Sequence, residues 1–233
     1  MVNLSIAIMH CPAFADRRKH VENIVEKISV KNIQQKVVDF NIFSDWYQKG
    51  LWFNARRSWM WCLSTKSTHH LVLQDDVIIC NNFIDTIINC IKTYPDSPLG
   101  LYANRKICEE AKSKDIRWVS IPDGVWGQAI LLPRFLVERF LNWERKHILP
   151  NFKYDDTRIA MFLVENKINS MCPMPSLVDH EGAATSTLGH SNKNRRARWF
   201  EKDKNYLDYN WSNKKFLQAP LGLKKDYYDY YVK

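Results

Sequence analysis

Residues 70–80, HLVLQDDVIIC, place two adjacent carboxylates between two apolar runs. Neighbouring anions repel each other, and burying a carboxylate is costly, so Asp75 and Asp76 require a cation or hydrogen-bond donors to compensate them. Because the two residues end the apolar run HLVL, we expect them at the mouth of a crevice beyond a strand end. The stretch therefore predicts a buried strand whose carboxyl end carries a charged site.

The segments around this stretch alternate between strand and helix patterns. Apolar, β-branched runs predict strands over 4–9 and 34–43, and residues 15–28 between them show the apolar spacing of a helix. Helices are also predicted over 54–66 and 81–94, before and after the opening stretch. This alternation is typical of an α/β fold, in which helices flank a mostly parallel, Rossmann-like central sheet.

The second half of the chain continues the same alternation. We expect a strand near Trp118, a glycine-containing loop over 123–127, helices over about 133–146 and 154–167, and a short strand between prolines in 169–182. Beyond these elements the regular pattern fades into a basic extension that is rich in aromatic residues. The sequence therefore predicts a single main domain with a C-terminal tail.

The charge of the chain is concentrated in that tail. The formal net charge is +9, and from His190 to Lys233 there are eleven Lys and Arg residues against five Asp and Glu residues. We predict a domain over 1–190 and a tail over 191–233. The bias indicates a polyanionic partner: nucleic acid first, then a membrane surface or nucleotide phosphates.

The cysteines and the apolar runs indicate the compartment. No CxxC pair occurs, so we expect reduced thiols that serve as small core residues rather than disulfides or a zinc site. No apolar run is long enough to span a membrane, and the N-terminal segment lacks the features of a signal peptide. A cytoplasmic protein is expected. The cysteines are Cys11, Cys62, Cys80, Cys90, Cys108 and Cys172.

Four segments carry a family resemblance. LVLQDDV, at 71–77, closely resembles the LILEDDV signature of GT-A type glycosyltransferases, in particular the lipooligosaccharide and collagen galactosyltransferase-like families and small phage-encoded, DNA-modifying enzymes. Residues 6–24 are similar to the family's first strand and Arg-bearing helix, and residues 175–189 to its late Pro-x-Leu-Val…Ser-Thr-x-Gly segment. Residues 50–77 look like the family's helix before the acidic motif, including its distance from that motif. The resemblance implies a GT-A fold and sugar transfer from a nucleotide-sugar, most simply a UDP-sugar, to a hydroxyl acceptor.

The resemblance also implies a divalent cation, Mn²⁺ or Mg²⁺. Asp76 stands at the metal-ligand position of the DxD-type motif, and His180 in LVDHEG fits a late histidine ligand, although a histidine with only local hydrogen bonds is the alternative. Asp75 would assist through a water molecule or a hydrogen bond. Gln74 replaces the usual first acidic residue, so its expected role is a hydrogen bond to a ribose hydroxyl.

The nucleotide part of the donor would be bound at the end of the first strand. The GT-A mode implies His10 there, with Arg17 and Arg57 on the diphosphate or the base, although either arginine can equally be a solvated helix charge. The sequence contains no GxxxxGK[ST] and no GxGxxG motif. A P-loop or a dinucleotide-binding fold is therefore unsupported.

The expected general base is a carboxylate, since an inverting transferase must take a proton from the acceptor hydroxyl. Asp155 and Asp156 begin a predicted helix, where one of them can act only as a cap. We favour Asp156, with Asp155 and Asp123 as alternatives. Asp123 lies in a loop in which Gly124 and Gly127 allow the backbone to approach a sugar closely.

The tail suggests the acceptor. Its alternating cations and aromatic residues suit phosphate contacts and stacking on an extruded base. We therefore expect hydroxymethylated pyrimidine in phage DNA, which would place the protein in the host cytoplasm. A glycan acceptor such as lipooligosaccharide is the first alternative, and a non-catalytic nucleic-acid-binding protein is the second; the tail could also simply pack on the domain. The tail residues assigned to the acceptor are Arg195, Arg196, Arg198 and Trp199. Trp126, in the loop over 123–127, could stack on a sugar or a base, and the alternative is an ordinary core tryptophan.

Overall fold

The computed structural model describes residues 2–32, 38–181 and 195–221. The strands are β1 (Leu4–His10), β2 (Val38–Ser44), β3 (His69–Gln74), β4 (Val77–Ile79), β5 (Leu99–Gly100), β6 (Trp118–Ile121), β7 (Ala129–Pro133), β8 (Ser170–Pro173), β9 (Val178–His180) and β10 (Phe216–Gln218). The helices are α1 (Ala15–Asn32), α2 (Leu51–Trp61), α3 (Phe83–Thr93), α4 (Ile107–Ser113), α5 (Arg134–His147) and α6 (Asp155–Glu165), with 3₁₀ turns η1 (Cys62–Ser64) and η2 (Tyr206–Asp208).

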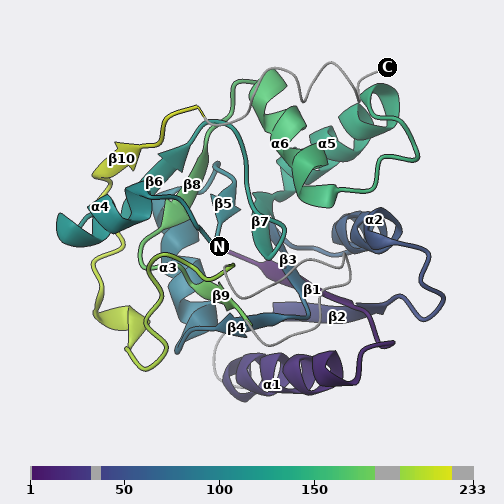
Figure 1. Ribbon diagram of the computed structural model, residues 1–233, viewed down its shortest axis with the longest axis horizontal. Helices are drawn as coiled ribbons and strands as arrows, with labels where there is room; N and C mark the ends of the chain where they lie inside the picture. Colours follow the sequence, from purple (N-terminus) through teal and green to yellow (C-terminus); the bar gives the residue numbers. More distant parts are fainter. Residues whose placement is uncertain (1, 33–37, 182–194, 222–233) are drawn as a thin grey trace.

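The central feature is an eight-stranded sheet in the order β10-β6-β8-β5-β7-β3-β1-β2, flanked by helices (Figure 1). β1 pairs in parallel with both β2 and β3, β5 pairs in parallel with β8, and β10 with β6. β7 runs antiparallel to β3 and β5, and β8 antiparallel to β6. The predicted α/β class, with a mostly parallel sheet between helices, is confirmed.

The two faces of the sheet are covered by different helices because side chains alternate along each strand. Ile6 and Ile8 of β1 belong to a buried cluster with α1 and α3, whereas Ala7 and Met9 belong to a second cluster with α2, α5 and α6. Each large apolar side chain buried in this way contributes about 1.5–3 kcal/mol. The cysteines are free thiols, as predicted, and all except the half-buried Cys11 are buried.

The stretch at 70–80 differs from the single strand that its apolar runs predict. β3 ends at Gln74, Asp75 and Asp76 form a turn, and β4 begins at Val77 in a separate two-stranded sheet with β9. The register of that pair sets Val77 opposite His180. The carboxylates therefore lie where the chain leaves the central sheet, at the strand end where they were expected.

Several regular elements were not predicted, and the one short strand expected in 169–182 is two strands, β8 and β9. β7 is the apolar run just before the predicted helix at 133–146, α4 is a short helix, and β10 is an edge strand in the predicted tail. The helix predicted over 54–66 begins earlier, at Leu51, and gives way to the 3₁₀ turn at Cys62.

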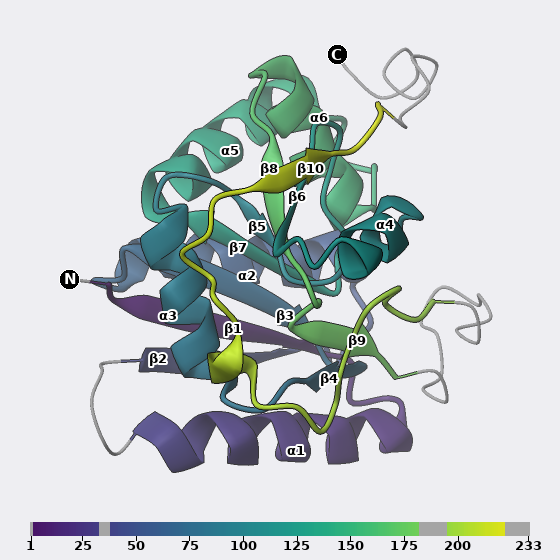
Figure 2. The same ribbon diagram turned by 90° about the vertical axis from the view of Figure 1, so that its left-hand side faces the viewer.

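The described part of the tail, 195–221, packs along the edge of the sheet beside α3 and ends past β10 (Figure 2). Tyr206 and Trp211 are buried in the main core, and Trp211 makes an edge contact with Trp118 at a ring distance of 6.0 Å. The Tyr206 hydroxyl donates to the Ser176 carbonyl at 2.9 Å. These aromatic residues are structural. The predicted boundary at 190/191 lies outside the described residues.

Candidate functional site

A cavity of about 630 Å³ opens at the carboxyl ends of β1 and β3 and extends to the start of α6 and to β9. Figure 1 labels these elements. Parallel strands direct their carboxyl ends to the same edge of a sheet, so residues that follow β1, β2 and β3 meet there. The predicted site residues that line the cavity are His10, Arg17, Gln74, Asp75, Asp76, Asp155, Asp156, His180 and Arg195.

Arg17 is the cation that compensates the adjacent carboxylates. Its guanidinium contacts Asp75 through Nη1 and donates from Nη2 to Asp76 Oδ2 at 2.8 Å. Asp75 Oδ2 also accepts from the Cys11 backbone N–H at 2.7 Å and from His10 Nδ1 at 2.9 Å. All three charged side chains are buried. The Arg17 guanidinium and the other donors therefore compensate the cost of burying two neighbouring anions.

The electrostatics of Arg17 follow from that geometry. Burial alone would lower the pKa of the guanidinium, but the Asp76 and Asp75 carboxylates outweigh burial and raise this pKa above its usual value. Arg17 therefore remains fully charged. Its expected role on the donor diphosphate changes accordingly, because two of its nitrogens are already engaged by carboxylates of its own chain.

Asp76 retains one oxygen for a further partner. Its Oδ1 atom is buried and has no hydrogen-bond partner among the described residues. His180 Nε2 lies 3.4 Å from Asp76 Oδ2, and His180 Nδ1 lies 3.2 Å from the Glu181 carbonyl oxygen. With the proton on Nδ1, donated to that carbonyl, Nε2 presents its lone pair to the cavity beside Asp76.

These atoms fit a divalent cation that a substrate would help to bind. Within the described residues no group of three or more His, Cys, Asp or Glu side chains could hold a metal ion by itself. One carboxylate and one imidazole are nevertheless suitable protein ligands for Mn²⁺, and Mg²⁺ commonly takes its other ligands from water and substrate phosphates. The unpartnered Asp76 oxygen is the structural feature that fits such an ion.

The opposite wall of the cavity carries the second carboxylate pair. Tyr154 is the residue before α6, and Asp155 and Asp156 are its first two residues. Asp156 Oδ1 accepts from the Thr157 backbone N–H at 2.7 Å. Neither carboxylate occupies the N-cap position, which differs from the capping role expected for one of them.

Gly127 connects the two walls. A Cβ atom at this position would lie 2.9 Å from Gln74 Nε2, 3.5 Å from Asp155 Oδ1 and 3.5 Å from Asp156 Cβ. A larger residue would therefore make ordinary contacts with the start of α6, but it would displace the side-chain amide of Gln74.

Burial changes the protonation of the second pair. Burial, followed by the charge of Asp156, raises the pKa of Asp155 to about 8. Burial also raises the pKa of Asp156, although hydrogen bonds from Thr157 and Gly127 and the charge of Arg195 oppose that rise. Carboxyl groups with pKa values raised toward neutrality suit proton transfer.

Several cavity residues were missed by sequence reasoning. Asp45 follows β2, and its carboxylate accepts from the backbone N–H groups of Lys49 and Gly50 at 2.9 and 3.0 Å. Asn54 on α2 donates to the Phe43 carbonyl at 2.7 Å, and Lys153 precedes α6. The strand-end rule that located Asp75 could have located Asp45, because both follow parallel strands at the same sheet edge.

Three predicted residues lie away from the cavity. Arg57 is exposed on α2, where its guanidinium lies 5.6 Å from the centroids of the Phe43 and Phe53 rings. Asp123 is buried and forms an ion pair with Arg105 at 2.6 Å. Trp126 contacts Tyr102 and the Arg105 guanidinium and is packed against the core. None of the three lines the cavity. Asp123, an alternative for the general base, is instead paired with Arg105.

The acceptor residues predicted in the tail divide in the same way. Arg195 lines the cavity, and its guanidinium forms no ion pair within the described part of the chain. Arg196 binds the buried carboxylate of Asp179, and Arg198 pairs with Glu109 on the surface. Trp199 is buried in the core beside Arg117. Only Arg195 is therefore placed to meet a ligand in the cavity.

No family model matches the chain, and no curated protein matches it. Among solved structures, A197 from STIV superposes with a TM-score of 0.46 and 13% identity over 81% of this chain and 92% of that one. A mutant Drosophila β1,4-galactosyltransferase 7 with manganese, UDP-Gal and xylobiose gives 0.43 and 11% over 92% and 83%. A glycosyltransferase involved in glycosylation of the PBCV-1 major capsid gives 0.37 and 12% over 74% and 94%. These similarities carry no functional argument, which rests on the cavity.

Proposed function

We propose that the protein is a glycosyltransferase that moves a sugar from a nucleotide-sugar, most simply a UDP-sugar, to a hydroxyl acceptor. The observation that carries this proposal is the pair of acidic walls in one cavity. On one wall, Asp76 keeps a buried oxygen without a hydrogen-bond partner beside His180; on the other, Asp155 and Asp156 hold carboxyl groups with raised pKa values. Cation binding and proton transfer are the two functions that such a transfer requires.

The donor would lie against β1 and β3. Asp76 and His180 would hold Mn²⁺ or Mg²⁺, which when bound neutralises the negative charge that develops on a departing diphosphate. Asp75 is held by Arg17 and His10 and would orient Asp76 rather than bind the donor itself. Arg195 and Lys153 are the cavity cations available to contact phosphate oxygens, and Gln74 can donate to a ribose hydroxyl.

The general base in this proposal is Asp156. It lines the cavity, is more accessible than Asp155, and its hydrogen bonds favour the ionised form. It would take the proton from the acceptor hydroxyl while the oxygen attacks the sugar carbon from the face opposite the diphosphate, giving inversion. Asp155, with a pKa near 8, would be mainly protonated at neutral pH.

Two acceptors are compatible with the cavity, a DNA base and a glycan hydroxyl. A hydroxymethylated pyrimidine in phage DNA remains our prediction, supported by the net charge of +9 and by Arg195 in the cavity. The aromatic residues within 195–221 give it no support, because Trp199, Tyr206 and Trp211 are core residues. A glycan hydroxyl is the alternative acceptor, since it needs the same base and the same donor site.

The first test measures donor binding. Isothermal calorimetry with Mn²⁺ and a panel of UDP-sugars should show binding of the nucleotide-sugar that depends on the metal ion. The variant Asp76→Asn should lose this dependence, whereas Asp96→Asn, at an exposed carboxylate outside the cavity, should keep it. Absence of any heat with wild-type protein, or nucleic-acid binding alone, would favour a non-catalytic protein.

The second test identifies the acceptor. Wild-type protein, Mn²⁺ and radiolabelled UDP-sugars are incubated with hydroxymethylated DNA, with unmodified DNA, and with a lipid-linked glycan. Label transferred only to hydroxymethylated DNA would support the DNA acceptor, and label transferred only to the glycan would contradict it. The variant Asp156→Asn serves as the inactive control for both.

A further inference from the structure

The loop between β2 and α2 exposes aromatic side chains next to the cavity. Trp46 is 66% exposed, Tyr47 84% and Phe53 40%, which is unusual for rings of this size. Lys49 lies 5.8 Å from the Tyr47 ring centroid and 4.9 Å from that of Phe53. Together with Arg57, which lies over Phe53, these five residues form a surface that we call the aromatic–cationic rim.

The loop is held in this shape by its own hydrogen bonds. The Asp45 N–H donates to the His10 carbonyl at 2.9 Å, and its carboxylate accepts from the Lys49 and Gly50 N–H groups. Gly50 has a φ of +109°, a conformation that other residues rarely adopt. These hydrogen bonds fix the path of the loop, and in this conformation the Trp46 and Tyr47 side chains are exposed.

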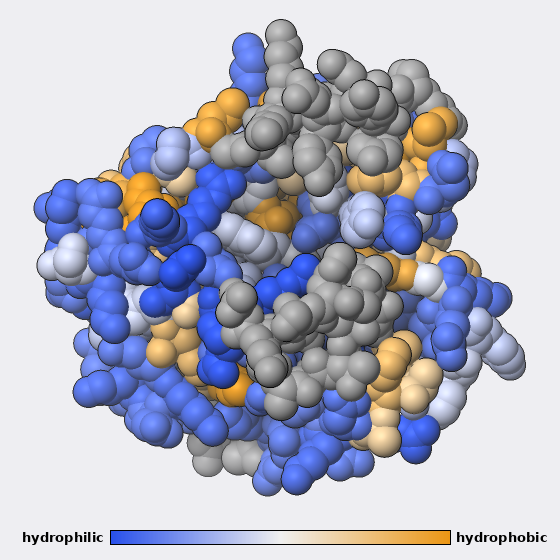
Figure 3. All heavy atoms as spheres, viewed as in Figure 1, coloured by the Kyte–Doolittle hydropathy of each residue, from blue (hydrophilic) through white to orange (hydrophobic). Residues whose placement is uncertain are grey.

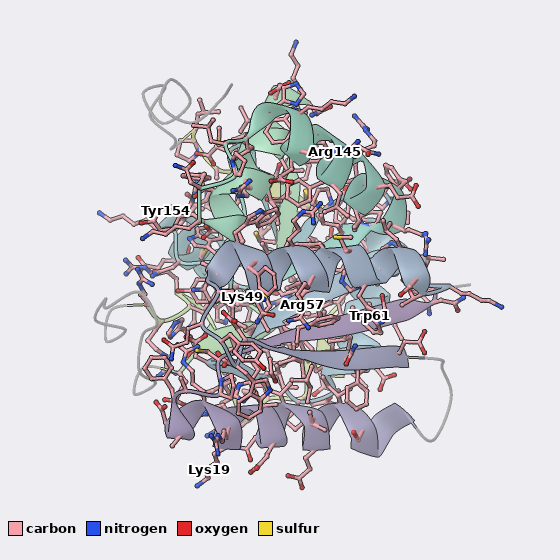
Figure 4. All side chains as sticks on the ribbon, turned by 90° about the vertical axis from the view of Figure 1, so that its right-hand side faces the viewer. Lys19, Lys49, Arg57, Trp61, Arg145 and Tyr154 are labelled. Carbon is pink, nitrogen blue, oxygen red and sulfur yellow. The ribbon has the colours of Figure 1, made fainter. Side chains whose placement is uncertain are left out.

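The rim continues along the outer side of α2. Phe53, Arg57 and Met60 are spaced by four and three residues, so they lie on one face of the helix, and Met60 is 44% exposed. Leu63, in the turn that follows, is 41% exposed. Figure 4, in which the right-hand side of Figure 1 faces the viewer, shows Lys49 before the start of α2, followed by Arg57 and Trp61 on the helix. Apolar and hydrophilic residues are interspersed on that side of the space-filling view (Figure 3).

The charge of this surface has one sign. Residues 45–66 contain four cations, Lys49, Arg56, Arg57 and Lys66, and a single acid, Asp45. Asp45 is buried and its carboxylate is occupied by backbone donors. The rim therefore presents positive charge without an exposed carboxylate from its own segment, and it fits an anionic partner.

We propose that the aromatic–cationic rim binds the surface of an anionic membrane. Trp and Tyr side chains favour the headgroup level of a bilayer, and a helix with outward apolar residues and flanking cations can lie in that interface. Met60 and Leu63 distinguish this partner from nucleic acid, because aliphatic side chains gain from entering lipid but do not stack on bases. No helix in the described part of the chain is long and apolar enough to cross a bilayer. The association is therefore peripheral.

Membrane binding would present the cavity to the lipid surface. Gln48, Gly50 and Leu51, in the same loop as Trp46 and Tyr47, line the cavity. A rim seated on headgroups would thus bring the cavity mouth to molecules anchored in the same leaflet. This proposal stands independently of sugar transfer, because the surface lies outside the catalytic residues.

The experiment is vesicle flotation of the full chain without any donor or acceptor. Wild-type protein should bind vesicles of about 30% phosphatidylglycerol in phosphatidylcholine, bind pure phosphatidylcholine much more weakly, and dissociate as ionic strength rises. The double variant Trp46→Ala/Tyr47→Ala should lower the partition coefficient at least about tenfold. Lys49→Ala/Arg57→Ala should lower it about fivefold for each cation removed.

A matched control removes equivalent groups elsewhere. Phe135, 45% exposed on α5, and the exposed Lys112 on α4 lie outside the rim, so Phe135→Ala/Lys112→Ala should bind vesicles like wild-type protein. Circular dichroism confirms that each variant is folded. The proposal is overturned if wild-type protein ignores anionic vesicles, if the control loses binding as the rim variants do, or if only a single-stranded oligonucleotide is bound through the rim. Donor binding by calorimetry is unaffected by any of these outcomes.

Discussion

The two carboxylate pairs of the cavity are adjacent residues in both cases, but their surroundings differ. Asp75 and Asp76 share the Arg17 guanidinium, and Asp75 receives two further hydrogen bonds. Asp155 and Asp156 have no such buried ion pair within the described residues; Arg195 acts on Asp156 only at longer range. The first pair is therefore bound to a fixed cation, whereas burial raises the pKa values of the second pair.

This difference assigns a function to each pair. The first pair is held in place by Arg17, and Asp76 keeps a buried oxygen without a hydrogen-bond partner among the described residues, which suits cation binding. A pair whose pKa values are raised can exchange protons during a reaction. In the sequence the two Asp-Asp dipeptides are identical. In the structure they differ because Arg17 pairs with the first and not with the second.

The largest expected effect comes from removing the negative charge of Asp76, the proposed metal ligand in the first pair. Asp76→Asn keeps the size of the side chain but loses its charge, so turnover should fall at least ~10³-fold, since stabilisation of the departing group would be lost. Turnover is measured by release of UDP, with Asp96→Asn as the control. Near wild-type turnover in Asp76→Asn would contradict the metal assignment.

Removing the Arg17 cation should make the buried pair Asp75 and Asp76 destabilise the folded protein. Arg17→Met leaves Asp75 and Asp76 buried without a counter-ion, so the free energy of unfolding should drop by about 3–5 kcal/mol. The cost of burying two negative charges without a counter-ion is largest where both carboxyls carry their charge, so the loss of stability should grow as the pH increases.

Urea denaturation of Arg17→Met and wild-type protein at pH 5 and pH 8 measures this effect. The deficit should be larger at pH 8. A matched control is Arg57→Met, which removes an exposed arginine that forms no ion pair within the described residues. An equal deficit at both pH values would contradict the counter-ion role of Arg17.

The general base is tested on the second pair. Asp156→Asn should lower turnover at least ~10²-fold while KM for the donor changes little, because the base acts on the acceptor. Donor binding by calorimetry is the accompanying control. A loss smaller than tenfold would transfer the role to Asp155.

Much of this fold could be predicted because apolar periodicity dominates it. The strands at β1 and β3 and the apolar faces of α1, α3 and α6 follow directly from the sequence, as Ile24, Ile87 and Ile159 illustrate. β7 was missed because its run, AILLP, adjoins the helix at 134–147 without a turn signal. β10 depends on pairing with distant Trp118 and has no periodicity of its own.

The site was predictable where it obeys the strand-end rule and failed where it depends on tertiary partners. Asp76, Gln74 and His10 follow β1 or β3 or end them, so the sequence located them. The engagement of Arg17 by both carboxylates, and of Asp123 by Arg105, depends on contacts across 58 and 18 residues. Likewise, the tail's aromatic residues resemble a nucleic-acid surface in sequence, but burial makes Trp199 and Tyr206 part of the core.

The smallest expected effect is a pH-dependent change in stability when Asp155 of the second pair is replaced. Because its folded-state pKa of about 8 exceeds the ordinary value of 3.8, the stability that it contributes is present at low pH and is lost as the pH rises through about 8. Asp155→Asn removes this ionisation, so the variant should melt higher than wild-type protein at pH 9 and nearly equally at pH 4. Its turnover at pH 7 should fall less than tenfold, since the protonated carboxyl and the amide are both neutral. Thermal unfolding followed by circular dichroism at the two pH values measures this effect: an identical difference in Tm at both would contradict the raised pKa of Asp155.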